Sequence, residues 1–512
     1  MWEFIYPISY IGLLLSAAVF FYLKERDLNA SAAKRGFWAS ALFYGLSFFI
    51  GDGGMLFSLI GVLTPDIAFL LAVVLIFNRL APKPRGIYFM IFAVIAGLKV
   101  YVIDNKVETV TKSLFQTEQL DLAPNAELLL DIKDHNLKGA LKPVLDKYNI
   151  TMSLAFPNLQ HPEYSDLDDY YVLDIPDEFL QDLERIKKEL KKIGVSDWIE
   201  ENEMVQAVPI FESDNIVRAK RTDYKVNDPA LEKLWGFDAM KVSELYTYIR
   251  TEQLKPSKKA KVAILDTGVE ADHEDISANY FSVAKKSDYD KMGHGTHCAG
   301  IAGAVSNNGK GIASFAPDNN FIEITSIKVL SDNGWGTQQG ILDGITKAAD
   351  LKMDVISMSL GGPSNDASQR AYAEAMKYAA KAGTVVVVAA GNSNADATGF
   401  SPANVEGVIT VSAIDENLDR AKFSNTVDNI KMGIAAPGVN IYSSFPKNDY
   451  KLLNGTSMAT PYVAGLAGML KAVNPDLTTE ELYEILNNSG KELKAGAETG
   501  KLIQPLQALQ AA

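Results

Sequence analysis

The pattern of hydrophobic and polar positions divides the chain at about residue 104. Before that point, apolar stretches with few or no charges follow one another. Their bounds are Phe4–Leu23, Phe37–Leu63, Ile67–Phe77 and Ile87–Ile103. The first stretch is long enough to cross the hydrocarbon core of a bilayer as a helix. The pattern predicts a transmembrane region of about four helices over residues 1–104, with the two middle stretches as a tight hairpin.

Basic residues between these stretches predict an orientation. Lysines and arginines gather at residues 24–35, after the first stretch, and at residues 79–85, before the last. Positively charged loops remain in the cytoplasm, and two of them share that side if two crossings separate them. Everything after residue 104 is then outside the cytoplasm. The alternatives are a cleavable signal peptide, although Met1–Phe4 lacks its basic start, or a cytoplasmic placement through an odd number of spans.

Residues 105–125 have the composition of a polar linker, and residues 126–225 are predicted to form a small α+β domain with a connecting tail. The expected order is β-α-β-β-α-β, which is ferredoxin-like. The strands are expected at Glu127–Lys133, Ile150–Phe156, Tyr170–Ile175 and Trp198–Ala207, and the helices at Leu137–Tyr148 and Glu178–Ile193.

Residues 226–512 alternate apolar strands with helices. This alternation is typical of an α/β domain in which a parallel sheet is covered on both faces. The expected strands are Lys261–Asp266, Phe321–Leu330, Asp354–Leu360, Thr384–Ala390 and Val408–Ala413.

Composition removes some classes of function. The 512-residue chain has a net charge of −14, so nothing in its charge favours a nucleic-acid partner. It has one cysteine, Cys298, and therefore forms no intramolecular disulfide.

Three short blocks carry an acid, a base and a nucleophile. A serine hydroxyl becomes reactive when a neighbouring base takes its proton, and Ser457 and His294 are the candidates for these two roles. Asp266 would hold the imidazole in one tautomer and stabilise the imidazolium. A zinc pair of His294 and His297 is the alternative, but it lacks the i, i+4 spacing and the glutamate of a zinc hydrolase helix. The blocks are Ala263–Val269, Gly293–Gly300 and Asn454–Pro461.

In their order Asp-His-Ser, these blocks resemble the subtilisin-like serine proteases, or subtilases, over about residues 227 to 475. The resemblance implies a three-layer parallel-sheet catalytic domain that hydrolyses peptide bonds through an acyl-enzyme. Asn392, after the run Thr384–Gly391, would donate its amide to the oxyanion together with the backbone N–H of Ser457. The helix after Ser457 is expected from Met458 to about Val473, with Pro461 in its first turn.

The same resemblance implies a polypeptide substrate bound between two extended segments, whose backbone groups would pair with it as in strand addition. Trp335 departs from the small residue usual at that rim. The expected substrate-binding residues are Gly334, Trp335 and Gly336 on one wall, Ser359, Leu360 and Gly361 on the other, and Gly391 and Gly399 beside the S1 pocket.

Residues 126–225 resemble the propeptide domain of subtilases, most closely at residues 197–203. This implies a domain that assists folding and places its C-terminal tail at the active site; a plain membrane-proximal adaptor is the alternative. The resemblance also implies a structural calcium site at Asp228, Asp275 and Asn308, since calcium prefers carboxylate and carbonyl oxygens. Lys310 in the same loop weakens that expectation.

These observations predict a multi-pass, membrane-anchored serine endopeptidase with its catalytic domain outside the cytoplasm. Its expected partners are a polypeptide substrate, the membrane and its own propeptide-like domain. The alternative is a catalytically silent scaffold or regulator with the same fold, which the intact Asp266, His294, Asn392 and Ser457 argue against.

Overall fold

The computed structural model describes residues 126–512 except residues 197, 208–210, 213–223 and 365. The chain divides into two compact units, Met1–Gln119 and Leu120–Ala512, and every described residue belongs to the second. The predicted membrane-spanning stretches and the linker at 105–125 therefore lie outside the described residues. Within the described part of the chain, no helix has both the length and the hydrophobicity to cross a bilayer.

A six-stranded parallel sheet forms the centre of residues 224–512, with the strand order β15-β14-β12-β10-β7-β8. Five of its strands confirm predicted ones. The sixth, β15, was not predicted; it reads Gly-Ile-Ala-Ala-Pro and has a single β-branched residue. The bounds are β7 (Ala260–Asp266), β8 (Ile322–Lys328), β10 (Val355–Met358), β12 (Val385–Ala389), β14 (Val408–Ile414) and β15 (Gly433–Pro437).

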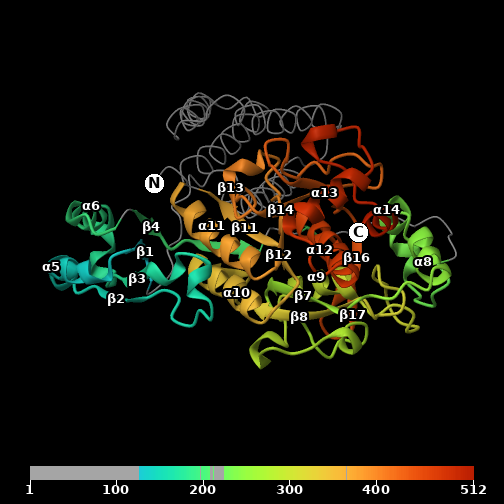
Figure 1. Ribbon diagram of the computed structural model, residues 1–512, viewed down its shortest axis with the longest axis horizontal. Coiled ribbons are helices and arrows are strands. Elements are labelled where there is room, and N and C mark those ends of the chain that lie inside the picture. Colours follow the sequence, from blue (N-terminus) through green and yellow to red (C-terminus); the bar gives the residue numbers. More distant parts are fainter. Residues whose placement is uncertain (1–125, 197, 208–210, 213–223, 365) are drawn as a thin grey trace, which may run out of the picture. The chain divides into compact units, whose positions relative to one another are not determined.

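Helices cover both faces of this sheet, so the domain has three layers (Figure 1). Along β7, Val262 and Ile264 pack into the core shared with α9 (His294–Gly303) and α12 (Thr456–Val473). Ala263 and Leu265 point the other way, into the core shared with α10 (Gln338–Asp350) and α11 (Asp366–Lys381). This alternation along one strand is the reason why its sequence is a continuous apolar run.

Further helices lie on the α9 and α12 side of the sheet, where their buried residues belong to the same core. They are α7 (Trp235–Ala239), α8 (Val242–Thr251), α13 (Thr479–Ser489) and α14 (Pro505–Ala511). Helix α12 runs through the centre of this layer and is buried along almost its whole length. Its glycines allow that depth, because a Cβ on Gly465 would lie 2.6 Å from the carbonyl oxygen of Ala302 in α9.

The first described residues form a separate antiparallel sheet with the order β2-β3-β1-β4, which together with its two helices has the ferredoxin-like topology. We call residues 126–207 the N-terminal lobe. Its predicted helices begin as 3-10 turns and continue as α-helices. The bounds are β1 (Leu128–Asp131), α5 (Lys142–Lys147), β2 (Thr151–Leu154), β3 (Tyr170–Asp174), α6 (Leu183–Ile193) and β4 (Ile199–Glu201).

The sheet of this lobe has apolar residues on both faces. Leu128 and Leu130 pack against the lobe's own helices. Leu129, between them, belongs to the core that contains α10 and α11. The lobe and the three-layer domain therefore share one hydrophobic core.

The predicted strand Trp198–Ala207 is wrong in one respect, because it is two strands. β4 stays in the lobe's sheet, whereas β5 (Met204–Ala207) leaves it and pairs with strands of the three-layer domain. Asn202 marks the break: its Nδ2 donates to the Ala126 carbonyl and its Oδ1 accepts from the N–H of Gln339, at 2.8 and 3.0 Å. The polar run Glu200–Glu203 lies at this change of sheet, between the apolar residues of the two strands, and the single predicted strand passed through it.

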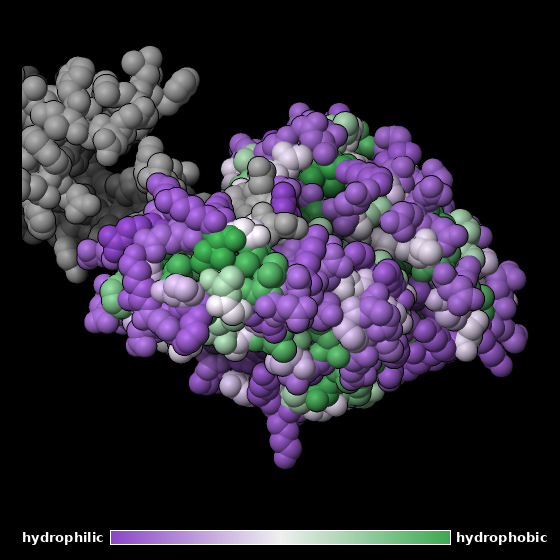
Figure 2. All heavy atoms as spheres, turned by 60° about the vertical axis from the view of Figure 1, so that its left-hand side comes forward, coloured by the Kyte–Doolittle hydropathy of each residue, from purple (hydrophilic) through white to green (hydrophobic). Residues whose placement is uncertain are grey.

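The surface turned forward in Figure 2 is mainly hydrophilic, with hydrophobic side chains in limited areas. The large hydrophobic side chains that the described residues expose are Leu137, Leu154, Tyr289, Trp335 and Leu351.

Candidate active site

The candidate catalytic residues gather at the carboxyl edge of the parallel sheet. Asp266 is the last residue of β7, Ser359 follows β10, and Asn392 comes three residues after the end of β12. In the sheet β7 lies between β8 and β10, so the chain leaves β7 to one side and returns on the other. Such a switch point is where open α/β sheets bind their ligands.

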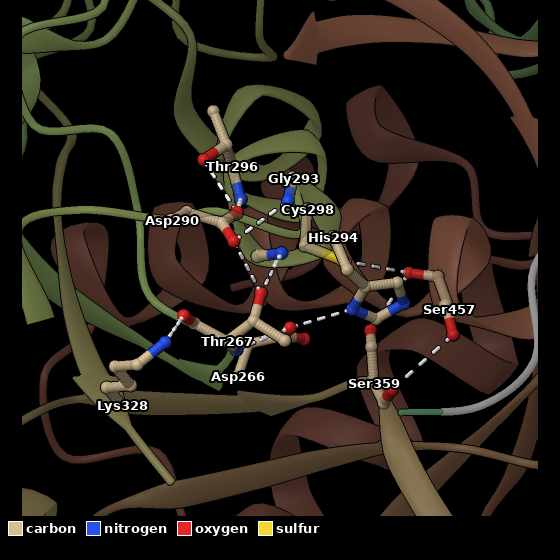
Figure 3. Close-up of polar contacts among 11 residues, drawn as sticks. Asp266, Thr267, Asp290, Gly293, His294, Thr296, Cys298, Lys328, Ser359 and Ser457 are labelled. Atoms are coloured by element: carbon tan, nitrogen blue, oxygen red, sulfur yellow. Dashed lines mark hydrogen bonds and ion pairs between the residues drawn. The ribbon is translucent and has the colours of Figure 1, made fainter. Parts of the chain in front are cut away.

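Asp266 and His294 form the central contact of the site. Asp266 Oδ1 lies 2.7 Å from His294 Nδ1 and also accepts the N–H of Thr267 at 2.7 Å. Both side chains are buried, and the imidazole lies between Asp266 and Ser457 (Figure 3). Burial alone would lower the pKa of His294, but the charge and hydrogen bond of Asp266, aided by the charge of Asp290, raise it above its ordinary value.

The other imidazole nitrogen, Nε2, is buried and has no hydrogen-bond partner among the described residues. It is therefore the nitrogen that a reacting hydroxyl would use. The three residues lie in the order that general-base activation of a serine requires, and the Ser457 hydroxyl donates to the Ser359 carbonyl at 3.4 Å.

Ser457 lies in the first turn of α12, directly after β17 (Asp449–Asn454). The helix begins at Thr456, two residues before the predicted start, so Pro461 lies in the second turn and not in the first. In a regular helix the N–H of residue 461 would bond the carbonyl of Ser457, and proline lacks that N–H. The hydroxyl of Ser359 donates to this carbonyl instead, at 2.9 Å, with the thiol of Cys298 at 3.5 Å.

Asn392 is fixed against the start of the same helix. Its Oδ1 accepts hydrogen bonds from the backbone N–H and the hydroxyl of Thr456, both at 2.9 Å. This pair of donors determines which end of the amide is oxygen. The Nδ2 group is then the donor that Asn392 presents on its other side.

The expected substrate-binding segments form two strands with β5 between them. β9 (Trp335–Thr337) and β11 (Leu360–Pro363) both pair antiparallel with β5, and the sheet continues into β13 (Phe400–Ser401). Gln206 is opposite Trp335 on one side and Gly361 on the other. The N–H of Ala207 donates to the Gly334 carbonyl at 2.8 Å. The two predicted walls thus come together around a strand of the same chain.

The two glycines expected beside the S1 pocket lie near these strands. Gly391 has a φ of +102°, and a Cβ there would lie 2.4 Å from Asn425 Nδ2, so the position requires glycine. Gly399 directly precedes β13, and its carbonyl accepts the N–H of Ser364 at 2.9 Å.

A short strand that follows the N-terminal lobe pairs with the strand that leads into Ser457. β6 (Phe211–Glu212) is antiparallel to β17, with Phe211 opposite Asn454. β17 itself pairs with β16 (Ile441–Phe445), and neither strand of this hairpin was predicted. The strand that leads into Ser457 is therefore paired on both of its sides, with β16 and with β6.

Asp228, Asp275 and Asn308 also come together, away from the catalytic residues. Asp275 accepts from Asn308 Nδ2 and from the N–H of Ile312, both at 2.8 Å, and Asp228 accepts from the N–H groups of Asn307 and Asn308. Burial raises the pKa of Asp275 to about 7 and also raises that of Asp228. Lys310 forms an ion pair with Glu274 at 3.6 Å and not with Asp275.

Two buried residues beside the triad were given no catalytic role in the sequence. The Cys298 sulfur, a carboxylate oxygen of Asp266 and a ring nitrogen of His294 all lie within 4.8 Å of one another. Asp290, which is also buried, accepts four hydrogen bonds around the start of α9. Cys298 lies four residues after His294 in α9, a helical spacing that could have indicated it. Asp290 lies in the loop before the helix, where no periodicity marks it.

Comparison with known proteins agrees with this geometry. Residues 257–502 match the model of the subtilase family. Thermitase of Thermoactinomyces vulgaris is 44% identical over 216 residues, which cover 41% of this chain and 74% of the relative. Subtilisin DY of Bacillus licheniformis is 39% identical over 248 residues, 47% of this chain and 87% of the relative. Subtilisin Savinase of Lederbergia lenta is 38% identical over 236 residues, 46% and 84% respectively. The chain belongs to the subtilase family and is a subtilisin-like serine endopeptidase.

Proposed function

We propose that this endopeptidase is anchored in a cell membrane by residues 1–104, acts outside the cytoplasm, and carries its own inhibitory propeptide-like segment. The observation that carries the catalytic part is the 2.7 Å contact of Asp266 with His294, with Ser457 on the other side of the imidazole. The following roles are assigned on that geometry.

Ser457 is the nucleophile and His294 the general base. As Ser457 Oγ attacks the substrate carbonyl, its proton passes to His294 Nε2, and the buried carboxylate of Asp266 stabilises the imidazolium. The oxyanion accepts from Asn392 Nδ2 and from the backbone N–H of Ser457 at the positive end of the α12 dipole. Collapse with loss of the amine, which takes the proton from His294, leaves the acyl-enzyme, and water releases it by the reverse sequence.

The substrate is an extended polypeptide that occupies the place of β5. The position of β5 between β9 and β11 supports this assignment, because it shows which backbone groups of those strands can pair with an added strand. Gly391 and Gly399 border the pocket for the side chain before the scissile bond. Trp335, which is 37% exposed, shapes the neighbouring subsite.

The N-terminal lobe acts as a propeptide-like inhibitor. Its support is that β5 takes the substrate's position while the lobe's sheet shares a core with α10 and α11. A separate adaptor domain would have no reason to pair with both walls of the substrate site.

The membrane placement rests on the apolar stretches of residues 1–104 and on their basic connections. Four spans put the catalytic domain on the outer side. Adding a protease to sealed cells tests this: an accessible catalytic domain agrees with the proposal, and a protected one contradicts it.

A calcium ion fits the residues around Asp275. Asp228 and Asp275 are two buried carboxylates, and the charge of Asp228 helps to raise the pKa of Asp275. No described lysine or arginine forms an ion pair with either. Burial raises the pKa of both carboxyl groups, and a bound cation would neutralise their charge. Asp228, Asp275 and Asn308 would supply oxygens, after reorientation of the Asn308 amide. Chelation should lower the melting temperature of the wild type and leave that of Asp275→Asn unchanged.

Labelling with a fluorophosphonate tests the catalytic assignment directly. The full chain and its Ser457→Ala variant are treated alike and the label is mapped by peptide mass spectrometry. A label on Ser457 establishes an activated nucleophile. Because β5 occupies the substrate's place, the same assay is run on Ala207→Pro, which loses the N–H that donates to Gly334. If neither the wild type nor Ala207→Pro is labelled, the catalytically silent scaffold is favoured.

A further inference from the structure

Asp290 touches no position where substrate would bind, yet it is 5% exposed and both of its carboxylate oxygens are fully used. Oδ1 accepts from the Thr267 hydroxyl at 2.9 Å and from the N–H of Gly293 at 2.8 Å. Oδ2 accepts from the N–H and the hydroxyl of Thr296, at 2.9 and 2.8 Å (Figure 3). All four of these hydrogen bonds are accepted by the carboxylate, and it donates none of them.

We propose that Asp290 is a positioning residue for the catalytic pair: it joins the loop that carries Asp266 to the helix that carries His294 and so fixes the contact between them. This inference rests on the proposed roles of Asp266 and His294. The two halves of the connection are visible separately.

The first half runs through Thr267. Its N–H donates to Asp266 Oδ1 at 2.7 Å, while its hydroxyl donates to Asp290 and accepts the N–H of Gly295 at 3.1 Å. The orientation of the Asp266 carboxylate is thereby linked to Asp290 through one residue. Thr267 is completely buried, so water cannot replace these bonds.

The second half is the start of α9. The N-cap residue, Gly293, has no side chain with which to cap the helix. The first N–H groups of a helix have no partner within it, and here Thr267 accepts that of Gly295 and Asp290 that of Thr296. Asp290 therefore caps the helix from outside it. His294 is the first residue of this helix, directly after the N-cap residue Gly293.

The carboxylate also contributes charge. The ionisable groups that face His294 are Asp266, Asp290, His297 and Cys298. Of these, both aspartates favour the imidazolium, and Asp290 does so without a direct contact. Its removal should change the geometry and the titration of His294 together, which a merely structural residue would not do.

The test measures kcat, KM and the pH dependence of kcat/KM on a peptidyl p-nitroanilide. Every protein compared is the full chain with Ala207→Pro, so that pH-dependent release of β5 does not enter the profile. In Asp290→Asn an NH₂ group replaces one carboxylate oxygen and cannot accept from the two donors of that oxygen. The contact between Asp266 and His294 should therefore shift. We expect kcat to fall by about 10- to 100-fold, as small misplacements cost, with KM within about twofold. The ascending limb of kcat/KM should move to lower pH, because a lost negative charge lowers the pKa of His294.

Asp354→Asn is the matched control. Asp354 is 7% exposed and accepts the N–H of Lys261 at 2.9 Å, at the opposite end of β7. We expect it to lower stability without moving the limb. If Asp290→Asn behaves like this control in kcat and in limb position, the positioning role is overturned.

Thr267→Val and Thr267→Ser provide the second comparison and decide the matter alone if Asp290→Asn does not fold. The valine loses the hydroxyl and should lose kcat, whereas the serine should retain it. Equal kcat values would overturn the inference. His294→Ala distinguishes failure of the proposed catalytic roles from failure of the positioning role of Asp290. If this variant keeps its activity, the proposed catalytic roles fail. If it is inactive while the Asp290 and Thr267 variants match wild type, only the positioning role fails.

Discussion

At the scale of single residues, the nucleophile's backbone is held by an unusual substitute for a helical hydrogen bond. Pro461 removes the donor for the Ser457 carbonyl, and the Ser359 hydroxyl takes its place at 2.9 Å. Ser359 also follows β10 and begins the substrate-binding wall, so one residue connects the wall to the nucleophile. The Cys298 thiol, at 3.5 Å, is a weak donor and cannot fully replace it.

We therefore expect Ser359→Ala to reduce both activity and stability. The Ser457 carbonyl would be buried with only the thiol as donor, at a cost of about 1–3 kcal/mol in the free energy of unfolding. The nucleophile would also lose its fixed position, so kcat should fall about tenfold or more. Steady-state kinetics and thermal unfolding measure the two effects.

Ser412→Ala is the control for that prediction. Ser412 is also buried and donates to a backbone carbonyl, that of Thr499, at 2.7 Å. It should lose stability to a similar extent and keep its kcat. Equal losses of kcat in the two variants would show that Ser359 has no special connection with the nucleophile.

At the scale of elements, the sequence determined most of the central sheet. The runs at β12 and β14 could be read as buried strands because they are short, rich in β-branched residues and flanked by glycine or aspartate. β15 was not predicted because residues Gly433 to Pro437 form a strand through their pairing with neighbouring segments and not through their own propensity. Asp266, His294 and Ser457 could be proposed as a triad for a different reason: they lie at ends of elements that short motifs mark.

The points where a strand changes its sheet or a helix begins were harder to predict from the sequence. The break at Asn202 is caused by hydrogen bonds to Ala126 and Gln339, which lie 76 and 137 residues away. The start of α12 depends on Asn392, which accepts the N–H of Thr456 from another loop. Contacts over such distances decide boundaries that local periodicity leaves open.

The strand β4 carries a carboxyl group that should make binding of the lobe depend on pH. Burial, and next the charge of Glu203, raise the pKa of Glu200 well above its ordinary value. Its neighbours across the interface are Gln338, which contacts its Oε1 at 3.4 Å, and Arg370, with the phenols of Tyr170 and Tyr372 nearby.

A carboxyl group whose pKa is raised in the bound state contributes full stability below its unbound pKa, and this contribution is lost as the pH rises through the bound pKa. Inhibition by β5 should therefore be strongest in acid and weaken as the pH rises. In Glu200→Gln the group cannot ionise, so inhibition should persist to higher pH. The measurement is the activity of the full chain at each pH relative to wild type, which cancels the titration of His294.

Glu201→Gln serves as the comparison for the pH prediction. Glu201 pairs with Lys187 at 2.8 Å within the lobe. Its substitution should leave the pH profile of inhibition as in wild type. If Glu200→Gln gives the same profile as Glu201→Gln, Glu200 does not govern the release.

At the scale of the whole described molecule, one hydrophobic core contains residues of both the N-terminal lobe and the three-layer domain. Leu129 and Val205 of the lobe belong to the same cluster as Ile341 and Tyr372 of α10 and α11. Separation of the lobe would expose this surface to water, at about 25 cal/mol for each Å² of apolar area. Release of β5 from between β9 and β11 is therefore coupled to the loss of apolar packing well away from Ser457.

This coupling predicts that an apolar residue of β5 controls activity without touching the triad. Val205 is 5% exposed and lies opposite Gly336. In Val205→Asp a carboxylate would have to be buried unpaired, which is far costlier than exposing it, so β5 should leave its place between β9 and β11. We expect fluorophosphonate labelling of Ser457 in the full chain to become at least tenfold faster than in wild type. Leu154→Asp introduces the same charge on the lobe at a side chain that is 43% exposed, and its labelling rate should stay that of wild type. Equal rates for Val205→Asp and wild type would mean that β5 does not limit access to the nucleophile, and the inhibitory role of the lobe would have to be abandoned.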